Sequence, residues 1–380
     1  MSNGASEMSM RHTRADVDLD ALRHNVAQLR AAADDSELWA VVKANAYGHG
    51  AVPCATAALG AGAAGLCVAL TQEVVELRKA GITAPIMVLS EQPINDLPVL
   101  VRHGAVCVAY NEHYLAALAD VARREQTVIQ VHLKVDTGMH RVGVSPDQSL
   151  ARAKTIAASS HLVLDGVMTH LATADDPAHT ATELQLNAFR HVIADLRAAG
   201  LRPRHIHVAN SAATMRRLVP ECTMVRGGIA MYGLLPGEGV AHFTAGLRPV
   251  MSLCTRITHV QRLRAGEGVS YGLRTVLDRD TTVATLPLGY ADGIARRAWE
   301  TPARVLVGGK SRRIVGVVTM DQMMVDCGDD AVSIGDEAVV FGEQAGSTVR
   351  VEDWARALGT ISYEVVCAVS SRVPRVYHGS

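Results

Sequence analysis

Short apolar segments rich in β-branched residues alternate with helical stretches through the first 230 residues, and this alternation most constrains the fold. Eight such segments occur, at residues 39–43, 65–69, 86–90, 105–110, 128–135, 163–169, 205–210 and 224–226. Strands that alternate with helices are typical of a parallel sheet with crossover helices. Eight strands also close a β/α barrel, whose chemistry collects where the strands end. We therefore predict an α/β fold with a (β/α)8 TIM-type barrel. An open doubly wound sheet is the alternative, but no GxGxxG turn follows the first strand.

Helical stretches separate most of these segments. Residues 71–81 carry glutamates early, a basic pair late and a terminal glycine, as a helix in that direction should. Residues 111–124 and 182–200 have similar patterns. These helices supply the crossover connections that the barrel needs.

The pattern changes near residues 247–250. Strand-like runs broken by Gly and Asp turns follow, at residues 250–262, 282–288, 304–307, 312–326, 337–341 and 365–376. Only residues 351–358 look helical there. Residues 15–20 alternate acidic and apolar side chains, which predicts a strand that can pair with this second region. We therefore predict a disordered extension at residues 1–13, a barrel domain at 14–247 and a mainly β domain at 248–380.

Composition excludes several classes of protein. Lysine and arginine total 37 and aspartate and glutamate 38, so the net charge of −1 gives no electrostatic case for nucleic acid or an anionic membrane. A hydrophobic content of 48% supports a large core. The uncharged stretch at residues 50–72 contains Pro53 and splits at residues 60–62, so it predicts a helix and a short strand rather than a membrane span.

Cysteine usage indicates a reducing compartment. The seven cysteines are scattered, with no Cys-x-x-Cys pair, at positions 54, 67, 107, 222, 254, 327 and 367. This odd, unclustered set argues against a disulfide framework and against a zinc site. The first twelve residues lack the apolar stretch of a secretion signal. We expect a cytoplasmic protein without a metal.

Lys43 is the first candidate for chemistry. It follows a short apolar strand and precedes a small, turn-forming segment, in a chain with only five lysines among its 37 basic residues. A lysine amine can lose its proton, which a guanidinium cannot, and a desolvated amine can form an imine with an aldehyde cofactor. The alternative is a strand-end lysine that reaches solvent.

The chain resembles the alanine racemases, which are pyridoxal-phosphate enzymes, from about residue 14 to residue 377. Several separated motifs carry the resemblance, and their joint order makes it specific. The motifs are VVKANAYGHG (41–50), HLKVDTGMHR (132–141), MTHLATAD (168–175), VANSA (208–212), VRGGIAMYG (225–233), VSYG (269–272), LGYADG (288–293), TMDQ (319–322) and ISYEV (361–365).

The resemblance implies two opposed bases. Lys43 matches the lysine that holds pyridoxal 5'-phosphate and then carries the proton of Cα on one face. Tyr271 matches the second base, supplied by the partner subunit, with a polar chain through His170, Arg226 and His207. The resemblance also places Arg226 opposite the pyridine nitrogen, where a guanidinium that stays protonated leaves the ring uncharged and a weaker electron sink. For Tyr271 and Arg226, the structural alternatives are a tyrosine that closes a β turn and a strand-end arginine in a salt bridge.

Phosphate binding is expected around residues 227–229. Backbone N–H groups after a strand form a nest for an anion, which implicates Gly228 and Ile229. By resemblance, the other ligands are Ser211, Tyr47 and Tyr363, with Asn210 beside them.

The substrate end is also implied by resemblance. Arg141 matches the residue that holds the cofactor's phenolic oxygen and the substrate carboxylate. Lys134 matches a lysine that many relatives carry as a carbamate, and a surface ion pair with Asp136 is its alternative. Met320 and Tyr290 match partner-chain residues that restrict the pocket to a small side chain.

Two positions depart from the family pattern. His140 stands where relatives often have glycine, which puts substrate range and pH optimum in doubt, and Thr319 stands where many have cysteine. Asp321 is assigned a supporting role. His49, despite its place in a motif, is expected to support the loop.

The resemblance implies a homodimer with shared active sites that interconverts L- and D-alanine, supplying D-alanine for peptidoglycan. A racemase of broader specificity or one acting on serine is the first alternative. A barrel-fold amino-acid decarboxylase is the second, but two bases and Arg226 argue against it. A non-catalytic pyridoxal-phosphate carrier would not need the β domain with Tyr271.

Overall fold

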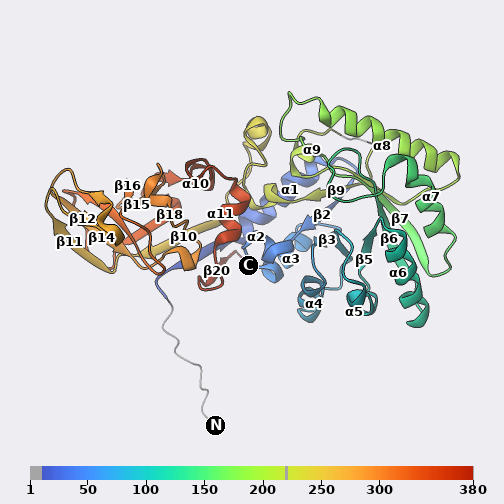
Figure 1. Cartoon of the computed structure of the whole chain (residues 1–380), viewed down its shortest axis with the longest axis horizontal. Helices are drawn as coiled ribbons and strands as arrows, with labels where there is room; N and C mark the ends of the chain where they lie inside the picture. The colour runs from blue at the N-terminus through green and yellow to red at the C-terminus, as the bar shows by residue number, and fades with distance from the viewer. Residues whose placement is uncertain (1–10, 219–220, 380) are drawn as a thin grey trace, which may run out of the picture. The chain divides into compact units, whose positions relative to one another are not determined.

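The computed structural model describes residues 11–218 and 221–379 and divides into two compact units. One unit is residues 19–248, and the other combines the N-terminal strand with residues from Pro249 onward (Figure 1). The predicted extension at 1–13 falls mostly on residues 1–10, which lie outside the described residues. Arg11 and Thr13, however, are held in place. Arg11 forms an ion pair with Asp292 at 2.6 Å, and buried Thr13 lies 2.8 Å from the hydroxyl of Thr255.

The first unit contains an eight-stranded sheet in which every pairing is parallel. Its order is β8-β7-β6-β5-β4-β3-β2-β9. The strands are β2 (Glu37–Val41), β3 (Gly65–Val68), β4 (Ile86–Val88), β5 (Val106–Ala109), β6 (Ile129–Lys134), β7 (Leu162–Met168), β8 (His205–His207) and β9 (Met224–Gly227). Backbone bonds from Thr223 to Ile206 and from Arg226 to Ala209 link the segments of β9 and β8. The predicted barrel is confirmed as a nearly closed one.

Helices cover the outside of these strands (Figure 1). They are α1 (Leu19–Ala32), α3 (Ala51–Gly60), α4 (Thr71–Lys79), α5 (Leu97–Arg102), α6 (Glu112–Arg124), α7 (Pro146–Ala157), α8 (Ala181–Ala198) and α9 (Ser211–Met215), with short 3-10 turns η1 (Ile94–Asp96), η2 (Ile229–Tyr232) and η3 (Glu238–Thr244). In α6 the buried residues include Leu115, Leu118 and Val121, three apart along one face. The stretch at 50–72 forms α3 and β3, as predicted.

The second unit is built on one ten-stranded sheet. Its order is β11-β14-β17-β16-β15-β18-β10-β1-β20, with β19 paired to β18. The strands are β1 (Arg14–Asp18), β10 (Met251–Arg256), β11 (His259–Leu263), β14 (Thr281–Leu286), β15 (Arg304–Val307), β16 (Lys310–Val315), β17 (Met323–Gly328), β18 (Glu337–Gln344), β19 (Ser347–Val349) and β20 (Arg375–His378). A separate hairpin joins β12 (Gly268–Val269) to β13 (Thr275–Val276). The N-terminal strand β1 pairs with β10 and β20, so it belongs to the β unit.

Short helices complete the second unit, and one of them corrects a prediction. They are η4 (Tyr271–Leu273), η5 (Tyr290–Asp292), η6 (Ala298–Glu300), α10 (Val351–Leu358) and α11 (Ser362–Ala368). The strand predicted at 365–376 is wrong, because α11 occupies its first part and only β20 is extended. The valines suggested a strand, but Ser362 and Val366 are buried one helical turn apart.

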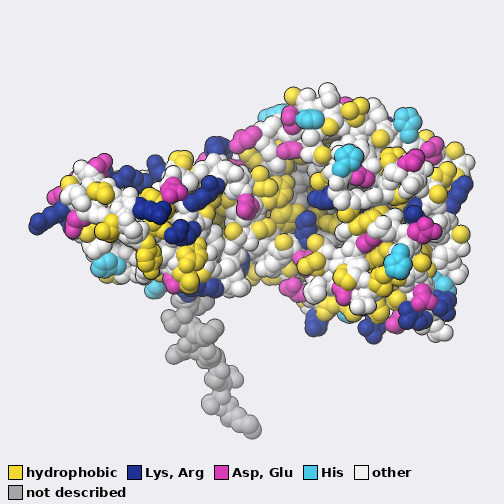
Figure 2. All heavy atoms as spheres, viewed as in Figure 1, with side chains coloured by type: hydrophobic (Ala, Val, Ile, Leu, Met, Phe, Trp, Pro, Cys, Tyr) yellow, Lys and Arg dark blue, Asp and Glu magenta, His cyan; other side chains and the backbone are white. Residues whose placement is uncertain are grey.

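Surface charge and cysteine state agree with the composition. Both signs of charge are interspersed over the visible face (Figure 2). Six of the seven cysteines are buried, and Cys367 is exposed. Within the described residues, no helix has the length and apolarity to cross a membrane.

Candidate functional site

Lys43 begins a left-handed turn directly after β2. The sequence predicted a strand through residue 43, but the strand ends at Val41 and α2 (Lys43–Tyr47) follows. Ala44, Asn45 and Ala46 have φ between 51° and 54° and ψ between 47° and 51°, and Tyr47 also has positive φ. Left-handed helical residues cost roughly 1–2 kcal/mol each. The turn therefore depends on contacts from its surroundings.

Two side chains hold this turn by accepting backbone N–H groups. Glu73 on α4 accepts from Ala44 at 2.5 Å through one oxygen, and from Ala69 and Leu70 at 2.7 and 3.0 Å through the other. Asn45 accepts from the N–H of Ala51 at 2.8 Å. These bonds tie the residues after Lys43 to two neighbouring helices.

Aromatic residues pack beneath the turn. The Tyr232 hydroxyl donates to the carbonyl of Val41 at 2.9 Å, and its ring lies 5.0 Å from Tyr47 and 4.5 Å from His49, centroid to centroid. His49 is buried, with Nδ1 3.0 Å from the carbonyls of Ala46 and Tyr47. His49 thus supports the loop, as expected.

Hydroxyl and backbone groups converge on Gly228, where β9 leads into η2. The Ser211 hydroxyl accepts from the N–H groups of Gly228 at 2.9 Å and Ala230 at 3.2 Å. A Cβ at Gly228 would lie 3.1 Å from the Tyr47 hydroxyl oxygen and 3.5 Å from that of Ser211. Two hydroxyls beside a bare backbone suit an anion such as phosphate. Ile229 is buried at the start of η2.

Asn210 acts as the N-cap of α9. Its Oδ1 accepts from the N–H of Ala213 at 3.1 Å, and it is half-buried. Asn210 therefore fixes the short helix that presents Ser211.

Arg226 lies buried at the end of β9 and makes four hydrogen bonds. Its Nη1 is 2.6 Å from His207 Nδ1, and its Nη2 is 3.1 Å from His170 Nδ1. Nη2 also donates to the carbonyls of Thr169 and Val208. Among the residues that the structure describes, no carboxylate forms an ion pair with Arg226, so the salt-bridge alternative is wrong. Burial lowers the pKa of Arg226 to about 10, which still leaves it charged at neutral pH.

The two histidines beside Arg226 are neutral acceptors. A guanidinium has no lone pair to offer, so both Nδ1 atoms must accept and each ring carries its proton on Nε2. Burial, followed by the nearby charge of Arg226, lowers the pKa of His170 and His207 well below the usual value. The structure thus brings together the barrel residues of the predicted polar chain.

Lys134 ends β6 inside the barrel. It is buried and makes no ion pair with Asp136 within the described ranges, so the surface-pair alternative is wrong. Burial, and then the charges of Arg226 and Arg141, lower the pKa of Lys134 to about 8. Lys43 also lies close enough to contribute to this shift. A useful fraction of Lys134 is therefore an uncharged amine near neutral pH.

Arg141 is exposed on the loop after β6 and follows a tight turn. Asp136 Oδ1 accepts from the N–H groups of Gly138, Met139 and His140, each at 3.0 Å. His140 adopts positive φ, a conformation that favours glycine, and its side chain points to solvent beside Asp136. The departure at His140 is therefore accommodated by three hydrogen bonds.

The remaining predicted residues belong to the β unit. Tyr271 begins η4 with its side chain 72% exposed, while Met320 and Tyr290 are 51% and 42% exposed. The N–H of Tyr290 donates to the carbonyl of Thr319, which joins the two segments predicted for the substrate end. Asp321 pairs with Arg372 at 2.6 Å, and Tyr363 is half-buried in α11. That Tyr271 faces Lys43 stays a prediction.

Comparison with known proteins decides the family. Residues 17–236 match the family model described as alanine racemase, N-terminal domain, and residues 250–377 match alanine racemase, C-terminal domain. The chain belongs to the alanine racemase family. The family assignment made from the motifs is therefore confirmed, and with it the prediction of an amino-acid racemase, an isomerase.

Relatives of the alanine racemase family match nearly the whole chain. "Alanine racemase" of Symbiobacterium thermophilum is 45% identical over 97% of this chain and 98% of its own length. That of Thermobifida fusca is 43% identical over 96% and 98%. The crystal structure of alanine racemase from D-cycloserine-producing Streptomyces lavendulae has a TM-score of 0.93 at 41% identity and covers 98% of both chains. The alanine racemase of Bacillus anthracis with bound L-Ala-P has a TM-score of 0.91 at 36% identity, covering 97% and 95%.

Four residues of this alanine racemase fold were missed by the sequence reasoning. Glu73 holds the turn after Lys43, Tyr232 bonds to Val41 at the end of β2, and His132 and Asp165 extend the polar chain beyond His207. His132 had a detectable signal, because it lies two residues before Lys134 and so shares its face of the strand. The sequence around Asp165, in contrast, does not distinguish this residue from aspartates on the surface.

Proposed function

We propose that the protein interconverts L- and D-alanine with pyridoxal 5'-phosphate, as a homodimer whose subunits share their active sites. The observation that carries the proposal is the buried, charged Arg226, adjoined by neutral histidines and by no carboxylate of the described chain. The residue that faces the ring nitrogen of the cofactor would decide how strongly the pyridine ring withdraws electrons. Arg226 can only donate, so it would hydrogen-bond to an unprotonated ring nitrogen, and the weaker electron sink that results favours return of the proton to Cα.

The residues of the barrel fit the cofactor. Pyridoxal phosphate, when bound, supplies an electron-accepting ring that makes the Cα proton of an attached amino acid acidic. Ser211, Tyr47 and the backbone at Gly228 and Ile229 would hold its phosphate, with Asn210 fixing Ser211. Lys43, at the start of the left-handed turn, would hold the aldehyde end of the cofactor.

Two side chains of this chain would move the proton. Lys43 removes or returns it on one face of Cα, and Tyr271 of the partner subunit acts on the other. A racemase needs both, because a single base tends to return the proton to the face from which it came. His170 is neutral and carries its proton on Nε2. This N–H would donate to the phenolic oxygen of Tyr271 of the partner subunit.

The substrate carboxylate would be oriented by Arg141. We propose that Lys134 carries a carbamate whose negative charge pairs with Arg141. A pKa of about 8 supports this, because only the uncharged amine reacts with carbon dioxide. Met320 and Tyr290 of the partner subunit would narrow the pocket to a methyl-sized side chain.

Exposed apolar side chains on the β unit support the homodimer. Tyr271, Leu273, Val276, Met320 and Ile361 are each more than half exposed. Tyrosine and methionine are enriched in protein interfaces, so these side chains are available to an interface that completes the site. We place the enzyme in the cytoplasm, where free thiols persist, and propose that its D-alanine serves peptidoglycan synthesis.

A side-by-side assay tests this function. Full-length protein with pyridoxal phosphate is incubated with L-alanine, L-serine and L-lysine, and both enantiomers are quantified by chiral chromatography while carbon dioxide is trapped. We expect D-alanine as the main product and no carbon dioxide. Faster turnover of serine, or release of carbon dioxide, would contradict the proposal.

A further inference from the structure

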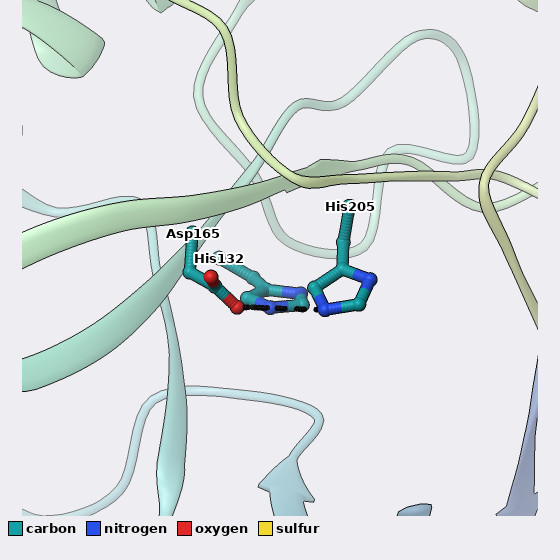
Figure 3. A group of neighbouring side chains, drawn as sticks. All are labelled: His132, Asp165 and His205. Atoms are coloured by element: carbon teal, nitrogen blue, oxygen red, sulfur yellow. Dashed lines mark hydrogen bonds and ion pairs between the residues drawn. The ribbon is translucent and has the colours of Figure 1, made fainter. Parts of the chain in front are cut away.

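A row of three buried polar side chains continues from Arg226 deeper into the barrel, and it consists of His207, His132 and Asp165. His207 Nε2 lies 2.8 Å from His132 Nδ1, and His132 Nε2 lies 3.2 Å from Asp165 Oδ2. His132 and His207 are fully buried, and Asp165 is 9% exposed. Figure 3 shows the carboxylate of Asp165 directed at His132, with His205 beside them. Such groups are costly to bury, so the row requires an explanation.

The hydrogen bonds of this row can run in only one direction. Arg226 only donates, so His207 accepts at Nδ1 and carries its proton on Nε2. That proton is donated to His132 Nδ1, which leaves the proton of His132 on Nε2, facing Asp165. An ionised carboxylate only accepts and ends the row. Every member is satisfied with both imidazoles neutral.

The charges at the two ends are opposite. Burial opposes ionisation of Asp165, but the hydrogen bond from His132 holds the pKa of this carboxyl below its usual value. Burial lowers the pKa of His132 as well, which keeps the ring neutral. Arg226 has no carboxylate partner within the described part of the chain. Asp165 is therefore the negative charge that Arg226 reaches through the two rings.

The strands are shaped to admit this row. The register of β6 against β7 pairs Val131 with Leu164 and then His132 with Gly166, which leaves Asp165 as an extra residue. Such a bulge re-aims a side chain. A Cβ at Gly166 would lie 2.5 Å from His132 Nδ1, so only glycine leaves room for the ring.

A metal ion is the competing interpretation, because ligand atoms of His132, Asp165 and His205 lie within 4.8 Å of one another. A metal on His132 Nε2 would leave the proton on Nδ1, facing His207. His207 would then carry its own proton on Nδ1, directly against the N–H of Arg226 at 2.6 Å. Two donors cannot share that contact. The geometry favours the hydrogen-bonded row.

We propose that His132 and Asp165 are positioning residues that fix the tautomer of His207 and balance the charge of Arg226, so that the guanidinium stays charged and immobile. This inference rests on the proposed function only where it predicts rates. His205 serves as the internal control. Its ring stacks on His132 at 5.4 Å, but its Nε2 is 3.7 Å from Asp165 and its Nδ1 has no partner within the described residues.

The first test reads the tautomers directly. The full-length protein as purified, labelled with ¹⁵N-histidine, is studied by NMR at neutral pH, and signals are assigned with His132→Phe, His205→Phe and His207→Gln. We expect the proton on Nε2 alone in both His207 and His132. A proton on Nδ1 of either ring, or an imidazolium, would overturn the proposal. This measurement needs no activity, and the wild-type result decides even if a variant fails to fold.

The second test compares matched variants in the holoenzyme. His132→Phe keeps an aromatic ring but removes the acceptor for His207, and Asp165→Asn removes the charge. We expect each to lower kcat about 10–100-fold, the range typical for loss of the partner that orients a metal-bound histidine, with KM for alanine changed little. His132→Phe should also give His207 a mixed tautomer, and His205→Phe should change neither. Equal effects in His132→Phe and His205→Phe, or stoichiometric zinc that His205→Phe releases, would refute the row.

The two proposals fail separately. If the wild type does not interconvert alanine, the proposed function is wrong, and the tautomers still test the row. If it does interconvert alanine while His207 carries Nδ1–H, only the positioning role is wrong.

Discussion

Glu73→Gln tests whether the strained turn after Lys43 depends on one carboxylate. Glu73 accepts three backbone N–H groups, two of them through one oxygen. The amide oxygen of glutamine can keep those two, at Ala69 and Leu70, which leaves its NH₂ opposite the N–H of Ala44. The substitution thus removes the contact to the turn alone.

The size of the effect follows from these contacts. The variant loses one charge-assisted hydrogen bond and places the glutamine NH₂ against the N–H of Ala44. Together these changes lower the free energy of unfolding by about 1–3 kcal/mol. The four left-handed residues together cost roughly 4–8 kcal/mol, so the turn loses a sizeable part of its support. For a unit of this size we expect Tm to fall by about 2–12 °C. The Kd for pyridoxal phosphate should rise about fivefold or more, because Lys43 is less well placed.

Thermal unfolding and cofactor titration measure both effects. Glu76→Gln is the matched control, since Glu76 lies on the same helix with an exposed side chain. If Glu73→Gln behaves like Glu76→Gln in both assays, the carboxylate does not hold the turn and the reasoning fails.

Three further substitutions test the proposed site. Lys43→Ala should abolish both the visible absorbance of bound cofactor and all activity, and retention of either would exclude Lys43 as the attachment point. Tyr271→Phe should keep the cofactor but slow conversion chiefly in the direction in which Tyr271 removes the proton; unchanged initial rates from both L- and D-alanine would eliminate it as a base. Gly228→Ala should raise the Kd for pyridoxal phosphate about 5–100-fold, because the new Cβ crowds the Tyr47 hydroxyl at 3.1 Å. Gly60→Ala meets no atom within 4 Å and should leave the titration unchanged.

The barrel was predictable because its signals are local. Strands such as β3 and β4 are short apolar runs that begin where the pattern places them, and helices such as α4 have charged ends. The run at 365–376 misled because β-branched residues favour strands only weakly and packing decides. There, burial of one face turned the first half into α11.

The turn after Lys43 was not predictable to the same depth. Small residues and two glycines indicate a turn, but nothing in the segment specifies four consecutive left-handed residues without glycine among them. Glu73, 29 positions beyond Ala44, stabilises that backbone. A conformation held by a distant side chain leaves no periodic trace in the sequence.

The row behind Arg226 shows why buried polar groups escape pattern reasoning. Alternation along a strand assigns Asp165 to a face only if the register is regular, and the bulge at Asp165 breaks the register. An extra residue on one strand turns the carboxylate toward His132, and a glycine in the next position leaves room for the ring. The bulge at Asp165 and the glycine at position 166 are both needed to bring the carboxylate and the ring together. The pairing of a bulge with a glycine therefore argues that the strand is built around the charge of Arg226.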